Sequence, residues 1–220
     1  MINTVLFDLD GTILDTNELI IESFMHVMEG RSFKPLTRDW LIQHMGKPLN
    51  TQLRYFTNRA EEEDVEDLVK LYRTYNLERH DDLVRAFPHT LEVCEALKQQ
   101  GVRMGVVTSK VRLTSEKGLR LCKLMDYMDT IVTVEDVQHP KPHPEPVLRA
   151  LQEMNAEPGQ TLMVGDSPYD IEAANRAGVR SVAVSWSLKD KELLQTFQPY
   201  TIIEDMNELL HLVNKENQSQ

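Results

Sequence analysis

The sequence predicts an α/β fold in which a doubly wound parallel sheet carries an inserted helical domain. Short apolar runs rich in β-branched residues alternate with helix-length amphipathic segments, which is typical of βα units around a sheet buried on both faces. The later runs start roughly 20 to 30 residues apart, about the length of one βα unit. The gap between Phe7 and Arg103 is several times longer, so we expect an insertion there.

The strands are expected at six short apolar runs, and the core helices between most of them. These runs span residues 4–7, 103–107, 130–134, 161–164, 181–184 and 201–203. Their near-continuous apolar character favours parallel strands over the alternating pattern of a half-exposed antiparallel sheet.

Residues 16–80 contain helical patterns only. One apolar stripe runs from Ile20 to Met28 and ends at Gly30, and a second runs from Val65 to Tyr75. The chain returns at "RAFPHT", where Pro88 is expected to start a helix. We therefore expect a core domain of residues 1–15 and 81–220 and a helical cap of residues 16–80. Ligands of open parallel sheets bind beyond the carboxyl ends of the strands, so the cap is expected to act as a lid there.

Composition excludes several classes of function. A net charge of -11 without a cluster of Lys and Arg argues against nucleic acid or an anionic membrane as a partner. Neither a leader-like segment nor an apolar run of membrane-spanning length is evident, which favours a cytoplasmic protein. Cys94 and Cys122 lack the spacing of a metal or redox motif. No obligate protein partner is expected.

Two acids follow the first strand in "FDLDGT". Side chains at i and i+2 of an extended segment point to one side, so Asp8 and Asp10 can face the same small volume, and Gly11 permits a sharp exit. The plainer alternative is an ordinary Asp-Gly turn.

Polar groups follow three further segments of the predicted sheet. Thr108 and Ser109 come after the second strand, Asp166 and Asp170 after the fourth, and Lys141 lies in "HPKPHPEP" between two stiffening prolines. Each has a plainer reading: Thr108 and Asp166 are also typical helix caps, and a lone lysine is usually solvated.

Together these groups favour a metal-dependent phosphate site. Four carboxylates, those of Asp8, Asp10, Asp166 and Asp170, would repel one another and lose ionisation without a cation. Ligand sets of oxygen atoms alone favour Mg²⁺ over Zn²⁺. The substrate would then be anionic.

The remaining phosphoryl oxygens would contact Lys141, Thr108 and the backbone amides near Asp10 and Ser109.

The order of these motifs resembles the haloacid dehalogenase-like hydrolase superfamily. DxDGT at 8–12, Thr108, Lys141 and GDxxxD at 165–170 occur in the order of its four motifs. "FDLDGTILDT", "TSK", "KPHPEP" and "AANRAG" resemble its phosphoglycolate phosphatase-like branch, whose helical cap follows the first motif on a Rossmann-like core. "VSWSLKDKELL" and "YTIIEDMNELL" are most similar to bacterial pyrophosphatases of the superfamily. His89 departs from the pattern, since relatives often have Gly after Pro88.

The resemblance implies roles for the acids. Asp8 would attack phosphorus and form an aspartyl-phosphate, and Asp10 would protonate the leaving oxygen and then deprotonate water. Mg²⁺ would be held by Asp8, the Asp10 carbonyl and Asp166, with Asp170 acting directly or through its neighbours.

The substrate expectation depends on "HMGKPLN" in the helical insert. Lys47 would present a cation to a charged leaving group if this loop faces the site, and a solvated surface lysine is the plainer alternative. With the resemblance, this favours inorganic pyrophosphate.

Alternatives to pyrophosphate hydrolysis are phosphoglycolate or another small phosphomonoester as substrate, a phosphosugar mutase, and a non-enzymatic phosphate-responsive module. A dehalogenase is disfavoured, because the resemblance implies that such enzymes lack the second acid at Asp10.

Overall fold

The computed structural model describes residues 1–60 and 64–218, and the chain divides into two compact units. One unit comprises Met1–Asp15 and Arg85–Gln220, and the other comprises Thr16–Val84. Among the described residues, no helix has both the length and the apolar character needed to cross a membrane.

The first unit is built on a six-stranded sheet in which every neighbouring pair is parallel. In spatial order the strands are β5 (Thr130–Val132), β4 (Arg103–Val107), β1 (Thr4–Phe7), β6 (Thr161–Gly165), β7 (Arg180–Val184) and β8 (Thr201–Ile203). The predicted α/β fold with a doubly wound parallel sheet is therefore confirmed.

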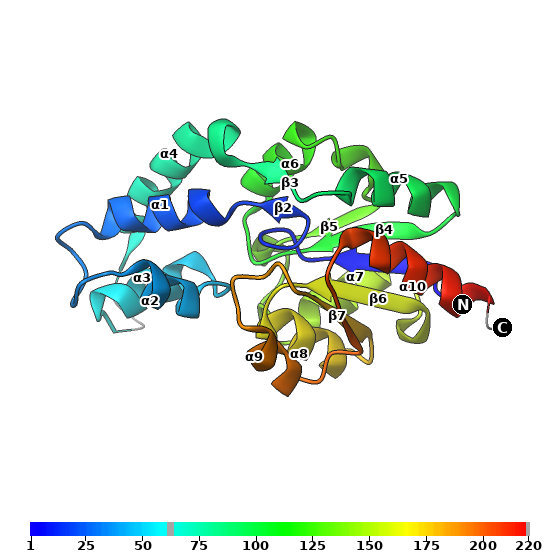
Figure 1. Cartoon of the computed structure of the whole chain (residues 1–220). Helices are drawn as coiled ribbons and strands as arrows, with labels where there is room; N and C mark the ends of the chain where they lie inside the picture. Colours follow the sequence, from blue (N-terminus) through cyan, green and yellow to red (C-terminus); the bar gives the residue numbers. More distant parts are fainter. Residues whose placement is uncertain (61–63, 219–220) are drawn as a thin grey trace. The chain divides into compact units, whose positions relative to one another are not determined.

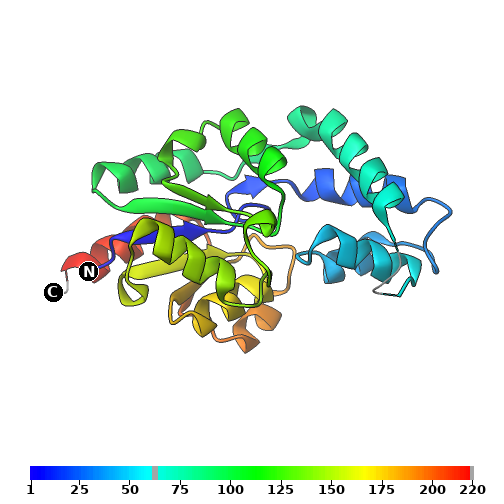
Figure 2. The same cartoon turned by 180° about the vertical axis from the view of Figure 1, so that it is seen from behind.

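Helices cover both faces of this sheet (Figure 1). They are α5 (Thr90–Gln99), α6 (Arg112–Leu121), α7 (Glu145–Met154), α8 (Pro168–Arg176), α9 (Lys191–Thr196) and α10 (Met206–Gln218), with short 3₁₀ turns at Met125–Tyr127, Val134–Asp136 and Pro158–Gln160. Helices α7 and α8 pack on one face, and α5 packs with α10 on the other, as the reverse view also shows (Figure 2). Burial on both faces explains why the strand sequences are almost continuously apolar.

The path of the chain creates a switch in direction beside β1. From β1 it proceeds to β4 and β5 on one side, and then returns to β6 on the other side of β1. Ligand crevices of doubly wound sheets lie beyond the carboxyl ends of the strands at such a switch. We therefore expect the functional site among the residues that follow β1, β4 and β6.

A second, two-stranded antiparallel sheet was not expected from the sequence. It pairs β2 (Leu14–Asp15) with β3 (Arg85–Ala86), so the chain leaves and re-enters the first unit side by side. Strands of two residues are too short to show a period in hydrophobicity, which is why the sequence pattern does not reveal them.

The second unit is helical, as expected for the insert. Its helices are α1 (Asn17–Met28), α2 (Arg38–His44), α3 (Leu49–Thr57) and α4 (Glu66–Leu83). Phe24 lies at the centre, with ring centroids 5.6 Å from Phe56 and 4.9 Å from Tyr72. Asn76 of α4 donates to the Ser23 hydroxyl of α1 at 3.2 Å, so a buried polar contact also joins these two helices.

Two local details differ from the sequence pattern. The expected return to the core at residue 81 lies in the last turn of α4, where the Val84 N–H still donates to the His80 carbonyl at 2.9 Å. Pro88 does not start α5, which begins at Thr90, because His89 adopts the left-handed conformation at φ 62°. The His89 Nδ1 lies 2.8 Å from Asp205 Oδ2, a contact that helps to hold this unusual backbone.

Candidate active site

The ends of three adjacent strands bring the predicted site residues of the first unit together. β1 lies between β4 and β6, with Phe7 in register with Val106 and Val164. The Asp8 N–H continues the ladder by donating to the Val164 carbonyl at 2.8 Å. Residues directly after these strands therefore meet at one edge of the sheet.

Three carboxylates converge there. Oxygen atoms of Asp8, Asp166 and Asp170 lie within 4.8 Å of one another. Gly165 permits this approach, because a Cβ at that position would lie 2.2 Å from the Cβ of Asp170. Gly11 makes room for the Asp166 side chain in the same way, because a Cβ added at Gly11 would lie 2.6 Å from Asp166 Oδ2. The φ of Gly11 is 82°, a conformation that favours glycine.

Lys141 is buried among these acids. Its Nζ donates to Asp8 Oδ1 at 2.6 Å, to Asp170 Oδ1 at 2.6 Å and to the Val107 carbonyl at 2.9 Å. Burial alone would lower the pKa of Lys141, but the carboxylates of Asp170 and Asp8 outweigh it and raise that pKa. Lys141 is therefore charged, and the reading of it as a solvated surface lysine is wrong.

Asp170 holds this lysine from the first turn of α8. Its second oxygen accepts from the Ser167 N–H at 3.0 Å and from the Ser167 hydroxyl at 2.6 Å, which forms a capping box. Both oxygens of Asp170 thus have protein partners. This arrangement fits a residue that positions Lys141 and the start of α8.

The acids of this cluster need more positive charge than Lys141 supplies. Burial, with the nearby Asp170 charge, raises the pKa of Asp8 to about 7 despite Lys141. Burial and the charges of Asp170 and Asp8 likewise raise the pKa of Asp166 well above its ordinary value. The carboxyls of Asp8 and Asp166, whose ionised forms need added positive charge, fit a hard cation such as Mg²⁺.

The carboxylate of Asp10 has a different partner. Its two oxygens lie 2.8 and 3.2 Å from Lys110 Nζ, and its side chain is 23 % exposed. Asp10 is therefore partly accessible to solvent and is oriented by Lys110, which is not among the site residues predicted from the sequence. The position of Lys110 two residues after Thr108 in "TSK" was the available signal.

Hydroxyl groups after β1 and β4 complete the site. The Thr108 hydroxyl accepts from the Lys110 N–H at 3.1 Å, so it caps its own turn. The hydroxyls of Ser109 and Thr12 are buried and have no hydrogen-bond partner within residues 1–60 and 64–218. Buried hydroxyls of this kind are suited to bind an anionic ligand.

Lys47 belongs to the other unit. It lies in the turn between α2 and α3, where its carbonyl accepts from the Gln52 side chain at 2.7 Å. Its expected contact with a substrate stays a prediction.

The fold and the site define a doubly wound α/β protein with an acidic site at the ends of its central strands. Residues 5–184 match the family model of the haloacid dehalogenase-like hydrolases. Two pyrophosphatases named PpaX are similar along almost the whole chain. The one from Bacillus anthracis is 42% identical over 218 residues, 99% of each chain, and the one from Bacillus mycoides is 41% identical over 216 residues, 98% of this chain and 99% of the relative.

A solved haloacid dehalogenase-like hydrolase from Bacteroides fragilis has the same architecture. It is 30% identical with a TM-score of 0.85, and the match covers 95% of this chain and 100% of that one. The chain therefore belongs to the haloacid dehalogenase-like hydrolases, as its ordered motifs predict, and is an enzyme of the hydrolase class.

Proposed function

We propose that this hydrolase is a Mg²⁺-dependent phosphohydrolase that acts through an aspartyl-phosphate on Asp8, and that inorganic pyrophosphate is its substrate. The observation that carries the proposal is the placement of Asp8. Its carboxylate is at the end of the central strand, bonded to buried Lys141 and within 4.8 Å of the Asp166 and Asp170 oxygens. The similarity to relatives named pyrophosphatase, at 42% identity, supports the substrate.

The metal would be held by Asp8, Asp166 and the backbone carbonyl of Asp10. Asp170 would contribute through Lys141 and Ser167, since both of its oxygens already accept hydrogen bonds. When bound, Mg²⁺ would neutralise charge on the transferred phosphoryl group.

The chemical steps are assigned to two acids of this chain. An Asp8 oxygen bonds to phosphorus while the bond from phosphorus to the bridging oxygen breaks, and Asp10 gives a proton to the departing phosphate. Asp10 then takes a proton from a water molecule that attacks phosphorus and releases Asp8. Lys110 contacts both oxygens of Asp10, so one of these contacts has to open before Asp10 can carry the proton that it gives to the departing phosphate.

Binding of the transferred phosphoryl group is assigned to Thr108, Ser109 and Lys141. Lys141 would exchange one of its three present acceptors, on Asp8, Asp170 and Val107, for a phosphoryl oxygen. The buried Ser109 hydroxyl supports this assignment, because it lacks a partner among the described residues. Charge on the transferred group resides on its outer oxygens, so donors aimed at those oxygens would stabilise the transition state.

A phosphate-release assay tests this proposal. With Mg²⁺, we expect a higher kcat/KM for pyrophosphate than for phosphoglycolate or hexose phosphates, and no turnover after chelation with EDTA until Mg²⁺ is restored. Preference for phosphoglycolate would overturn the assignment of pyrophosphate as the substrate and leave the proposed mechanism in place. Isomerisation of a hexose phosphate without phosphate release would instead identify a mutase, and full activity after exhaustive chelation would refute the metal assignment.

A further inference from the structure

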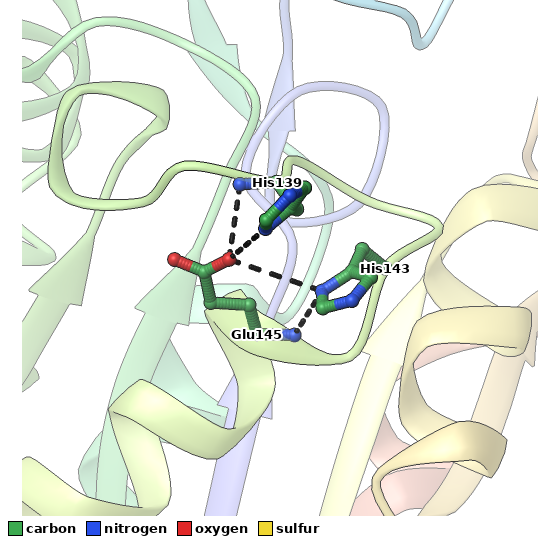
Figure 3. Close-up of side chains that lie close together, drawn as sticks. All are labelled: His139, His143 and Glu145. Atoms are coloured by element: carbon green, nitrogen blue, oxygen red, sulfur yellow. Dashed lines mark hydrogen bonds and ion pairs between the residues drawn. The ribbon is translucent and has the colours of Figure 1, made fainter.

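A second group of metal-binding side chains lies outside the acidic cluster. His139 and His143 lie in the segment that leads into α7, Glu145 is the first residue of that helix, and the three side chains point toward one another (Figure 3). His139 Nδ1 is 2.8 Å from Glu145 Oε2, and His143 Nδ1 is 3.9 Å from the same oxygen. The two imidazole rings have centroids 4.7 Å apart.

These distances suit a tetrahedral ion. Bonds of about 2.1 Å to zinc place neighbouring ligand atoms about 3.4 Å apart, which lies between the two observed nitrogen–oxygen distances. The side chains of His139 and His143 are 62 % and 49 % exposed, so small rotations can equalise the distances. Their exposure also leaves room for water as a fourth ligand.

The carboxylate of Glu145 is already held in place by the backbone. Its oxygens accept from the backbone N–H groups of Gln138 at 2.8 Å and His139 at 3.0 Å. An anionic ligand fixed by backbone hydrogen bonds loses little freedom when a metal binds.

Both imidazole nitrogens already take part in hydrogen bonds that a metal would replace. His143 Nδ1 accepts from the Glu145 backbone N–H at 3.2 Å, because an amide can only donate, and His139 Nδ1 donates to Glu145 Oε2 at 2.8 Å, because a carboxylate can only accept. Metal binding would therefore displace one proton from His139 and the amide hydrogen bond from His143.

We propose that His139, His143 and Glu145 form a binding site for a zinc-type transition-metal ion, separate from the oxygen-only cluster around Asp8. Imidazole nitrogen suits such ions, and the hard cation Mg²⁺ prefers oxygen, so the two sites select different metals. The proposal is independent of the proposed pyrophosphatase activity.

The site also brackets Lys141. His139 and His143 lie two residues before and two residues after it, and Lys141 reaches from the same segment to Asp8 and Asp170. A metal held by both histidines would restrain the backbone on each side of Lys141. Residues 138–145 should therefore exchange their amide hydrogens more slowly when the ion is bound.

The test is calorimetric titration of the full chain with Zn²⁺ in the presence of millimolar Mg²⁺, which keeps the acidic cluster supplied with its own cation. We expect one Zn²⁺ per chain, with His139→Ala and His143→Ala each weakening binding at least tenfold. His211→Ala, at another exposed histidine on α10, is the matched control and should leave binding unchanged. Unfolding midpoints without Zn²⁺ should be alike for all four proteins, because the changes are at exposed sites.

Equal affinity in wild type and in either cluster variant would overturn the site. So would Zn²⁺ binding that is lost in Asp166→Asn but kept in both histidine variants, since the ion would then occupy the acidic cluster. Faster or unchanged hydrogen exchange across 138–145 with Zn²⁺ bound would contradict the restraint on Lys141.

Discussion

Lys141 ties two buried carboxylates to one ammonium group. Its contacts with Asp8 and Asp170 are both 2.6 Å, and all three side chains are largely shielded from water. Removing one partner of such a buried network typically costs about 3–5 kcal/mol, because the remaining charges lose their compensation. The sequence pattern predicts Lys141 as a phosphate ligand, and the structure adds that it also holds the Asp8 carboxylate in position.

Proton release should accompany Mg²⁺ binding at this site. Burial raises the pKa of Asp8 to about 7 in the metal-free protein, against 3.8 ordinarily, so folding favours its protonated form. The contribution of Asp8 to stability is therefore full below about pH 4 and is lost as the pH rises through about 7. Mg²⁺ needs the ionised form, so its affinity should increase between pH 5.5 and 8, by up to about tenfold per pH unit for each proton displaced.

Calorimetric titration with Mg²⁺ at several pH values measures this dependence. The Asp8→Asn protein is the control, because it lacks one of the displaced protons and should show a shallower slope. An affinity that does not change with pH in wild type would contradict the assignment of Asp8 as a metal ligand.

Asp10 is expected to matter for rate more than for folding. Its carboxylate is partly exposed and bonded to Lys110, so Asp10→Asn should leave the unfolding midpoint close to that of wild type. The loss of a general acid should reduce kcat by about 100-fold or more. Steady-state phosphate release measures the effect, and a near-normal kcat would assign the proton transfers to another group.

At the scale of elements, the junction of β6 and α8 determines how closely the acids approach. Gly165 is the last residue of β6, and Asp170 is in the first turn of α8, so the backbone of one contacts the side chain of the other. The capping box between Ser167 and Asp170 fixes the entry into the helix.

Gly165→Ala should damage both stability and activity. The added methyl group would overlap with Asp170 Cβ at 2.2 Å, and overpacking of this kind costs about 1–3 kcal/mol. Displacement of Asp170 would also shift Lys141, so kcat should fall. Gly159→Ala is a matched control, because nothing lies within 4 Å of a Cβ added there. Denaturant unfolding and phosphate release measure both effects, and equal behaviour of the two variants would contradict this account of the junction.

The six strands of the parallel sheet could be predicted from the sequence, because burial on both faces makes each strand almost continuously apolar. The residues after β1, β4 and β6 could be placed as well, since parallel strand ends share one edge. The Asp10–Lys110 pair and the three-residue cluster at His139 could not, because they depend on side-chain directions within loops. The sequence pattern places the start of α5 at Pro88 and not at Thr90 for a related reason: His89 has a left-handed backbone without being a glycine.

At the scale of the molecule, we expect the α/β unit to carry the chemistry and the helical unit to contribute to substrate selection. All the acids and Lys141 belong to the α/β unit, and Lys47 belongs to the helical unit. The order of the units along the chain places the helical insert directly after the DxDGT motif, between β2 and β3. A cap that meets the departing group would then select substrates by their charge.

Lys47→Ala should reduce kcat/KM more for pyrophosphate than for a phosphate ester with a neutral leaving group. The physical reason is that only a charged leaving group gains from a nearby ammonium group. Lys70→Ala is the matched control, because Lys70 is an exposed lysine of the same unit paired with Glu66 on α4. Equal losses of kcat/KM for both substrates would show that Lys47 does not interact with the charge of the leaving group.

The central claim, that the Asp8 carboxylate is the nucleophile, is tested most directly by Asp8→Asn. Phosphate release from pyrophosphate with Mg²⁺ should be abolished, and acid-quenched protein mixed with ³²P-labelled pyrophosphate should carry no label on the peptide that contains residue 8. The fold should persist, because the Asn amide oxygen can still accept from Lys141 and the change removes one of three mutually repelling carboxylates; the unfolding midpoint checks this. Substantial Mg²⁺-dependent turnover by a folded Asp8→Asn protein would contradict the account.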